Sequence, residues 1–185
     1  MYIIAGKYKG LKLNGPKKSK TRPIMSFAKE RLFNIIGVLI QDKKILDLYA
    51  GTGAIGIEAL SRGCKHVTFV EKNFSAYNVI KRNIDKCNEY SNTSVVIDDV
   101  ISYIKRNVEV FDIIFSSPPY NCSYYFNFLT IIDNNVHVLN ESGHIIIECN
   151  IHTKGNFELN NIFKYKEFKC DDTVFEFWMQ KTKTV

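Results

Sequence analysis

The sequence predicts a doubly wound α/β domain, in which a mainly parallel sheet is covered by helices on both faces. From residue 44 onwards, short apolar runs that suit buried strands alternate with segments of helical period, and this alternation is typical of parallel sheets. A glycine-rich turn, GTGAIG at residues 51–56, follows the first of these runs. Two β-rich runs at residues 163–170 and 173–180 are close enough to form an antiparallel pair at the C-terminal edge.

The chain has 185 residues, of which 45% are hydrophobic and 24% charged, so it can bury one core but hardly a second domain. We divide it into a basic extension, residues 1–24, and a main domain, residues 25–185. No apolar run is long enough to span a membrane and the N-terminus lacks a signal-peptide pattern, so we expect a cytoplasmic protein without membrane contact. Five cysteines without a C-x-x-C pair predict reduced thiols and no metal site. The sequence does not fix the oligomeric state, and a monomer is the working expectation.

Each predicted element follows from its local pattern. Residues 2–13 alternate and contain two glycines, which suits a short hairpin. Ser26 is a candidate N-cap for a helix whose apolar side docks on the main domain. The remaining elements are a strand at 44–50, a helix at 53–63, a strand at 66–71, a helix at 74–88, a strand at 93–99, a helix at 100–107, a strand at 111–117, a helix at 124–139 and a strand at 143–149.

Positive charge is concentrated at the N-terminus. Residues 1–44 hold eleven Lys and Arg against two acids, a balance of +9, whereas the remaining 141 residues carry −3. A basic segment on a mildly acidic domain is typical of a protein that binds a polyanion. Apolar and tyrosine residues are interleaved with these charges, which favours a folded nucleic-acid-binding segment over a solvated arm.

Glycines and acids follow the predicted strands at the edge where α/β sheets bind ligands. Gly51, Gly53 and Gly56 satisfy G-x-G-x-x-G, and Glu71 ends the second strand, where a carboxylate can bind a ribose diol. This fingerprint suits a nicotinamide dinucleotide or S-adenosylmethionine. Asp47 favours S-adenosylmethionine, because it would repel a pyrophosphate but attract the methionyl ammonium or the sulfonium. The other expected cofactor contacts are Tyr49 beside the turn and Asp98 or Asp99 near the adenine, with Asp99 favoured.

The stretch FSSPPY at residues 115–120 ends the fourth strand. Two prolines fix two φ angles and remove two N–H donors, so carbonyl groups there are left free to accept hydrogen bonds. By itself such a segment is a strand-terminating turn as readily as a substrate clamp. Its position, on the same edge of the sheet as the glycine turn, favours the clamp.

The chain resembles the RsmD-type methyltransferases, which modify a guanine N2 of bacterial 16S rRNA. The resemblance rests on IIAGKYKGLKL, TRPIMSFAKERLFNII, ILDLYAGTGAIGIEALSRG, VTFVEKN and SSPPY, which occur in the family's order and approximate spacing. It implies a Rossmann-like class I methyltransferase fold with an N-terminal β-hairpin extension, S-adenosylmethionine as cofactor and rRNA or the assembling small subunit as partner. It also implies a catalytic group at residues Ser117, Pro118, Pro119 and Tyr120.

The resemblance assigns a role to each part of that group. Ser117 Oγ and the Pro118 carbonyl would accept the two amino hydrogens, and Tyr120 would stack on the unstacked base. In-line methyl transfer then depends mainly on positioning and needs no metal. The family usually has Asp or Asn where this chain has Ser117, which weakens the inference of guanine specificity. The N-terminal extension would hold the RNA through phosphate contacts from Lys7, Lys9, Lys12 and Arg22.

Three alternatives stay open at the level of sequence. Because serine occurs at this position in many cytosine-N4 methyltransferases, the target could be an amino group of adenine-N6 or cytosine-N4 in DNA or RNA. A non-catalytic RNA-binding ribosome-assembly factor is a second alternative. A nicotinamide oxidoreductase is disfavoured by Asp47, by the proline motif and by the lack of room for a substrate domain.

Overall fold

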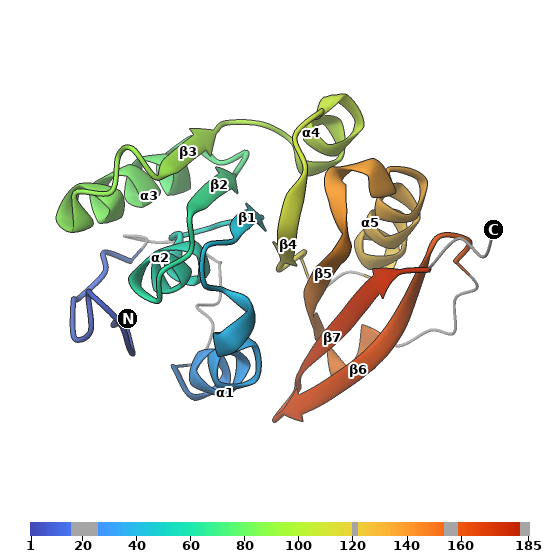
Figure 1. Cartoon of the computed structure of the whole chain (residues 1–185), viewed down its shortest axis with the longest axis horizontal. Coiled ribbons are helices and arrows are strands. Elements are labelled where there is room, and N and C mark those ends of the chain that lie inside the picture. Colours follow the sequence, from blue (N-terminus) through green and yellow to red (C-terminus); the bar gives the residue numbers. More distant parts are fainter. Residues whose placement is uncertain (16–25, 120–121, 154–158, 182–185) are drawn as a thin grey trace.

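The computed structural model describes residues 1–15, 26–119, 122–153 and 159–181, apart from the side chains of residues 26, 122 and 123. Its centre is a seven-stranded sheet with the order β3-β2-β1-β4-β5-β7-β6 (Figure 1). The order reverses between β1 and β4, which is where doubly wound sheets bind ligands. The predicted doubly wound α/β architecture is therefore confirmed.

Five parallel strands form the larger part of the sheet. Their apolar, β-branched sequences suit strands that are buried on both faces. In chain order they are β1 (Lys44–Leu48), β2 (His66–Val70), β3 (Thr93–Val96), β4 (Phe111–Ser116) and β5 (Leu139–Asn150). The register pairs Asp47 with Phe115 and Ser116 with Ile147. The residues just after β1 and β4, together with Glu148 of β5, consequently lie at one edge of the sheet.

The sheet ends in the predicted antiparallel pair. β6 (Ile162–Cys170) and β7 (Thr173–Gln180) are joined by a tight turn in which Asp171 has a φ of 52°. β7 pairs with β5 in the antiparallel direction, from Ile145 opposite Trp178 to Asn150 opposite Thr173. This edge lies away from the glycine-rich turn (Figure 1).

Helices cover both faces of the sheet and enclose two apolar cores. The helices α1 (Ser26–Ile36), α2 (Ala54–Ser61) and α3 (Phe74–Cys87) pack with Ile45, Phe69 and Phe115 on one face. On the other face, α4 (Val100–Arg106) and α5 (Cys122–Asn134) pack with Leu46 and Ile114. Because side chains alternate along a strand, odd-numbered residues of β1 face the first core and even-numbered ones the second.

Two predicted boundaries are wrong by four residues or more. The helix expected at residues 124–139 ends at Asn134, and residues Val136–Val138 form a 3-10 turn instead. Asn135, with φ −128° and ψ 37°, leaves helical geometry, and the strand then begins at Leu139, four residues earlier than expected. The register of β5 against β4 shifts between Phe111 and Ile113, so the added residues are accommodated by a β-bulge.

The N-terminal segment, residues 1–15, folds back onto α2. It doubles back as a hairpin would, but Tyr2 and Lys12 form only an isolated antiparallel bridge. The physical reason is that several of its N–H groups donate to α2 instead: those of Ile4 and Ala5 to Glu58, and that of Tyr8 to Ser61. The exposed fractions of Ile3 and Leu13 are only 2% and 3%, so this segment shares the main core. The division at residue 24 stays a prediction, since residues 16–25 lie outside the described part.

Among the described helices, none combines the length and apolarity that crossing a bilayer requires.

Candidate active site

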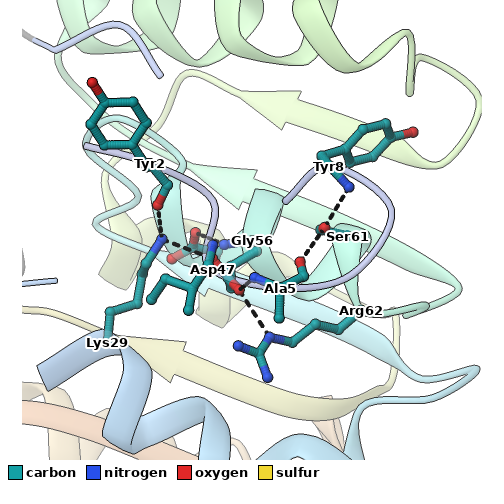
Figure 2. A network of polar contacts seen from close by, with 10 residues as sticks. Tyr2, Ala5, Tyr8, Lys29, Asp47, Gly56, Ser61 and Arg62 are labelled. Atoms are coloured by element: carbon teal, nitrogen blue, oxygen red, sulfur yellow. Dashed lines mark hydrogen bonds and ion pairs between the residues drawn. The ribbon is translucent and has the colours of Figure 1, made fainter. Parts of the chain in front are cut away.

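Asp47 is a buried carboxyl group near the end of β1. Its Oδ2 accepts a hydrogen bond of 3.1 Å from the N–H of Gly56, in the first turn of α2 (Figure 2). The N-cap residue of α2, Gly53, has no side chain for this purpose, so Asp47 satisfies one of the free donors at the helix start. Burial raises the pKa of Asp47 to about 8; the charges of Glu71 and Glu148 act in the same direction, and the Gly56 N–H opposes them.

The glycine turn has the conformation that its sequence predicts. Gly51 and Gly53 have φ values of 58° and 73°, in the left-handed region that favours glycine. Gly56 is needed for packing instead: a Cβ there would lie 2.3 Å from Cε1 of Phe69. The turn therefore brings the backbone of residues 51–53 to the ligand edge while α2 packs closely on β2.

Glu71 follows β2 and is held in place by the turn. Its Oε2 accepts the N–H of Gly51 at 2.9 Å, and its Oε1 accepts the N–H of Asn73 at 2.8 Å. Each carboxylate oxygen has a second lone pair, so these bonds orient the group without exhausting its capacity to accept. The structure thus brings Glu71 and the glycine turn together, as the fingerprint predicts.

The acids after β3 have partners within the protein. Asp99 is the N-cap of α4 and accepts the N–H groups of Ile101 and Ser102 at 3.0 and 3.3 Å. Asp98 forms an ion pair with Arg106 and accepts the N–H of Asp99. A capping role for Asp99 is compatible with a ligand contact from its remaining lone pairs. Their assignment to adenine stays a prediction.

Tyr49 directly follows β1, and the charge of Asp99 acts on it. It has a φ of 56°, and its ring meets Phe128 edge-on with ring centroids 6.4 Å apart. Burial raises the pKa of its phenol, with additional repulsion from Asp99 and Tyr124. Tyr49 is thus a neutral, partly buried ring at the same edge, where its predicted cofactor contact remains untested.

Ser117 and Pro118 directly follow β4 on the other side of β1. The N–H of Ser117 donates to the carbonyl of Leu48 at 3.4 Å, which continues the β1–β4 pairing by one step. Pro118 is buried and Pro119 is exposed. Tyr120, the fourth predicted member of this group, lies outside the described residues. The proline motif therefore begins beside the glycine turn, across the β1–β4 pair.

Glu148 is a site residue that the sequence analysis missed. It lies on β5, is 7% exposed, and accepts the hydroxyl hydrogen of Ser117. The register that pairs Ser116 with Ile147 places Glu148 beside Ser117. The sequence does contain a sign of this residue: Glu148 is an acid near the end of the apolar fifth strand, HIIIEC, just as acids lie near the ends of the first three strands.

Three of the predicted RNA contacts lie on the N-terminal segment and are exposed: Lys7, Lys9 and Lys12. The ammonium of Lys7 forms an ion pair of 3.1 Å with Glu89, although 69% of the Lys7 side chain stays exposed. Lys86 of α3 donates to the Lys12 carbonyl at 2.8 Å, so a further cation lies beside this segment. Arg22 lies outside the described residues.

One lysine counted in the basic N-terminus is not available to RNA. Lys29 of α1 is fully buried, and its Nζ lies 2.9 Å from Oε2 of Glu58. The same ammonium donates to the carbonyl of Tyr2, and Arg62 donates to the other oxygen of Glu58 (Figure 2). Lys29 therefore fixes the N-terminal segment to α1 and α2.

Asn83 connects the N-terminal segment with the glycine turn. This fully buried side chain on α3 donates to the carbonyl of Thr52 at 2.9 Å and to that of Asn14 at 3.2 Å. Its Oδ1 accepts the N–H of Asn14 at 2.7 Å. A side chain with all its polar groups engaged holds the two elements in a fixed relation.

The arrangement favours S-adenosylmethionine over a dinucleotide. A pyrophosphate would require the free N–H groups at the start of α2, but Asp47 already accepts one of them. A donor-rich cationic ligand fits a buried carboxyl group beside Glu71. Within the described residues, no three His, Cys, Asp or Glu side chains are grouped closely enough to hold a metal ion.

Comparison with known families agrees with this geometry. Residues 1–179 match the family described as "Conserved hypothetical protein 95". The chain belongs to this family. A relative from Bacillus subtilis, "Putative rRNA methyltransferase YlbH", is 35% identical over 80% of this chain and 82% of its own. The ribosomal RNA small subunit methyltransferase D of Buchnera aphidicola is 30% identical over 72% and 70%, respectively.

A solved structure shows the same fold. "Putative methyltransferase yhhF from Escherichia coli" superposes with a TM-score of 0.87 over 99% of both chains, at 24% sequence identity. The resemblance to RsmD-type methyltransferases is confirmed by the family match and the relatives, and the predicted Rossmann-like methyltransferase fold is confirmed by this superposition.

Proposed function

We propose that this protein is an S-adenosylmethionine-dependent rRNA methyltransferase that modifies the exocyclic N2 amino group of a guanine in 16S rRNA. The observation that carries the proposal is the adjacency of two groups. The buried Asp47, with the glycine turn, ends β1, and the Ser117-Pro118-Pro119 motif ends the neighbouring β4. One group suits a cationic adenosyl cofactor and the other an amino group.

S-adenosylmethionine is the cofactor that fits these residues. When bound, it supplies a methyl group activated by its sulfonium. Asp47 would hold the methionyl ammonium, because a positive charge compensates the burial of that carboxylate. Glu71, already oriented by Gly51, would accept from the ribose hydroxyls, and the backbone at Gly51 is uncrowded, since a Cβ there would meet only the Tyr49 carbonyl oxygen, at 3.9 Å.

The proline motif is the proposed binding site for the amino group. An exocyclic amino group on guanine is a poor nucleophile because its lone pair is delocalised into the ring. Two acceptors, Ser117 Oγ and the carbonyl of Pro118, would bind its hydrogens and favour a localised lone pair aimed at the methyl carbon. Tyr120 would stack on the flipped base.

The N-terminal segment is the proposed RNA-binding surface. Lys7, Lys9 and Lys12 are exposed, and Lys29 and Asn83 fix the segment to the elements that carry the glycine turn. RNA bound through phosphate contacts would thereby be held in a defined position relative to the cofactor. The small-subunit substrate is supported by the name of the Buchnera relative.

The experiment that tests the proposal identifies the modified nucleoside. The protein is incubated with methyl-labelled S-adenosylmethionine and 30S particles that lack their own guanine-N2 methylation, and the rRNA is digested to nucleosides. We expect the label in N2-methylguanosine, and a large loss of label with Asp47→Ala. Label in a methylated adenosine or cytidine would move the function to the alternative amino-group targets. RNA binding without any label would favour the non-catalytic assembly factor.

A further inference from the structure

The Ser117 hydroxyl can act as an acceptor only if its own hydrogen is directed elsewhere. A hydroxyl has one hydrogen and two lone pairs, and in water it would donate as readily as it accepts. In this structure Ser117 donates that hydrogen to Oε2 of Glu148. The lone pairs of Ser117 Oγ are therefore the part of the hydroxyl left for a substrate amino group.

Glu148 is placed to make this arrangement persistent. Asp47 lies on β1 and Glu148 on β5, and Ser117 directly follows β4, the strand between them. Alternation along the strands directs Asp47 and Glu148 to the same face. The exposed fraction of Glu148 is 7%. Its charge contributes to the raised pKa of Asp47, as expected for two carboxyl groups at the same edge of the sheet. A buried carboxylate requires hydrogen-bond donors, so the Ser117 hydroxyl is held toward it.

We infer that Glu148 is a positioning residue that works through Ser117: it turns the hydroxyl into an acceptor for the substrate amino group and takes the proton released when that group is methylated. This inference rests on the proposed function and deepens it. It also explains how serine can serve where RsmD-type enzymes usually have Asp or Asn. The pair Ser117 and Glu148 together would supply the strong acceptor that a single side chain supplies there.

The proton balance of the step is complete. The bond from the guanine nitrogen to the methyl carbon forms as the bond from sulfur to that carbon breaks, and the sulfonium charge passes to the nitrogen. The nitrogen then loses one hydrogen as a proton to Ser117 Oγ. Ser117 passes its own proton to Glu148, which becomes a neutral acid and later returns that proton to water. No oxidant, metal or further reactant is required.

The test uses Glu148→Gln, which preserves size but cannot accept a proton, with Ser117→Ala and the double variant. Methyl transfer to 30S particles is measured as kcat and KM for the particle, and affinity for S-adenosylmethionine by calorimetry. We expect Glu148→Gln to lower kcat about 100-fold, with KM and cofactor affinity within about threefold of wild type. The double variant should lose no more than Ser117→Ala, because both residues act as one unit.

A matched control separates this role from a general cost of altering a buried acid. Glu176 of β7 is 4% exposed and also accepts a hydroxyl hydrogen, but from Tyr125 of α5, on the other face of the sheet. Glu176→Gln should leave kcat within about threefold of wild type, and thermal denaturation shows that each variant is folded. If the wild type is active and Glu148→Gln leaves kcat unchanged, the inference is wrong but the proposed function stands. The same holds if the losses of kcat from Glu148→Gln and Ser117→Ala add in the double variant. A wild type that transfers no methyl group would overturn the proposed function and this inference with it.

Discussion

Lys29 and Glu58 form an ion pair of 2.9 Å in which both side chains are fully buried. Glu58 also accepts the N–H groups of Ile4 and Ala5. Burial alone would raise the pKa of Glu58, but the Ile4 N–H and the Lys29 ammonium outweigh it and hold that pKa below its ordinary value. The pair therefore joins α1, α2 and the N-terminal segment.

Removing the cation of this pair should destabilise the protein strongly. Lys29→Met leaves the Glu58 carboxylate buried with only Arg62 and two N–H groups as partners, and we expect the free energy of unfolding to fall by about 3 kcal/mol. The exposed Lys65 provides the control, since Lys65→Met should change it by less than about 0.5 kcal/mol. Urea denaturation measures both. Equal effects of the two substitutions would contradict a structural role for the buried pair.

The attachment of the N-terminal segment can be tested with two glycines of similar conformation. Gly6 and Gly10 have φ values of 82° and 84°, but a Cβ at Gly6 would lie 1.8 Å from the carbonyl oxygen of Ser61, whereas a Cβ at Gly10 meets nothing within 4 Å. Gly6→Ala should therefore displace the segment from α2 and weaken RNA binding about tenfold or more, without changing affinity for S-adenosylmethionine.

Gly10→Ala carries the same backbone strain without the clash, so its RNA affinity should fall much less. Fluorescence anisotropy with a labelled 16S rRNA fragment measures both variants. If the two substitutions weaken RNA binding equally, RNA binding does not depend on the contact between the N-terminal segment and α2.

The exposed lysines of the same segment should contribute through phosphate contacts. Replacing Lys7, Lys9 and Lys12 by alanine should weaken RNA binding and reduce the slope of log affinity against log salt by about 2, since each contact contributes about 0.7–0.9. Lys7 should contribute least, because its ammonium already pairs with Glu89.

The control for this triple variant replaces exposed lysines outside the N-terminal segment, namely Lys65, Lys105 and Lys169. Its slope should match that of wild type, and both triple variants should bind S-adenosylmethionine normally. A slope that stays unchanged when Lys7, Lys9 and Lys12 are removed would place the RNA-binding surface elsewhere.

Cofactor binding should depend on pH through Asp47. Burial raises the pKa of Asp47 to about 8 in the free protein, so near pH 6 the group holds its proton, whereas a bound ammonium favours the carboxylate. Binding must then release a proton. The affinity for S-adenosylmethionine should accordingly rise by close to tenfold from pH 6 to pH 7.

Calorimetry in two buffers of different ionisation enthalpy measures that proton directly. Measurements are kept below pH 7.5, because an α-amino group itself loses its proton at about 7.7–8.0. Asp47→Asn can still accept the Gly56 N–H, but it should bind more weakly and release no proton. Equal proton release by wild type and Asp47→Asn would show that another group faces the ammonium.

The sequence was most informative where local pattern and strand order agree. The strand and helix alternation and the glycine turn predicted the sheet and its ligand edge, because buried parallel strands and positive φ angles restrict the choice of residues. The end of α5 was misjudged since the apolar period continues beyond Asn134, while the chain leaves helical geometry at Asn135.

Contacts between distant residues could not be predicted in the same way. In the sequence Lys29 looks like a surface lysine, because its partner Glu58 lies on α2 and only the folded chain brings the two together. Glu148 looks like an isolated acid in an apolar strand, and only the β4–β5 register places it beside Ser117. Asp99 carries both a capping and a ligand-binding signal in sequence, and the structure shows the cap. Such pairs depend on tertiary placement, which residue periodicity does not encode.

Methyl transfer to the small subunit is the most direct test of the central claim. The measurement follows label from methyl-labelled S-adenosylmethionine into 16S rRNA of 30S particles that lack their own guanine-N2 methylation, with wild-type protein and with Asp47→Asn. We expect saturable transfer that approaches one methyl group per particle for wild type and falls at least about 100-fold for the variant. Folded wild-type protein that binds the particles but transfers no more label than Asp47→Asn would contradict the claim.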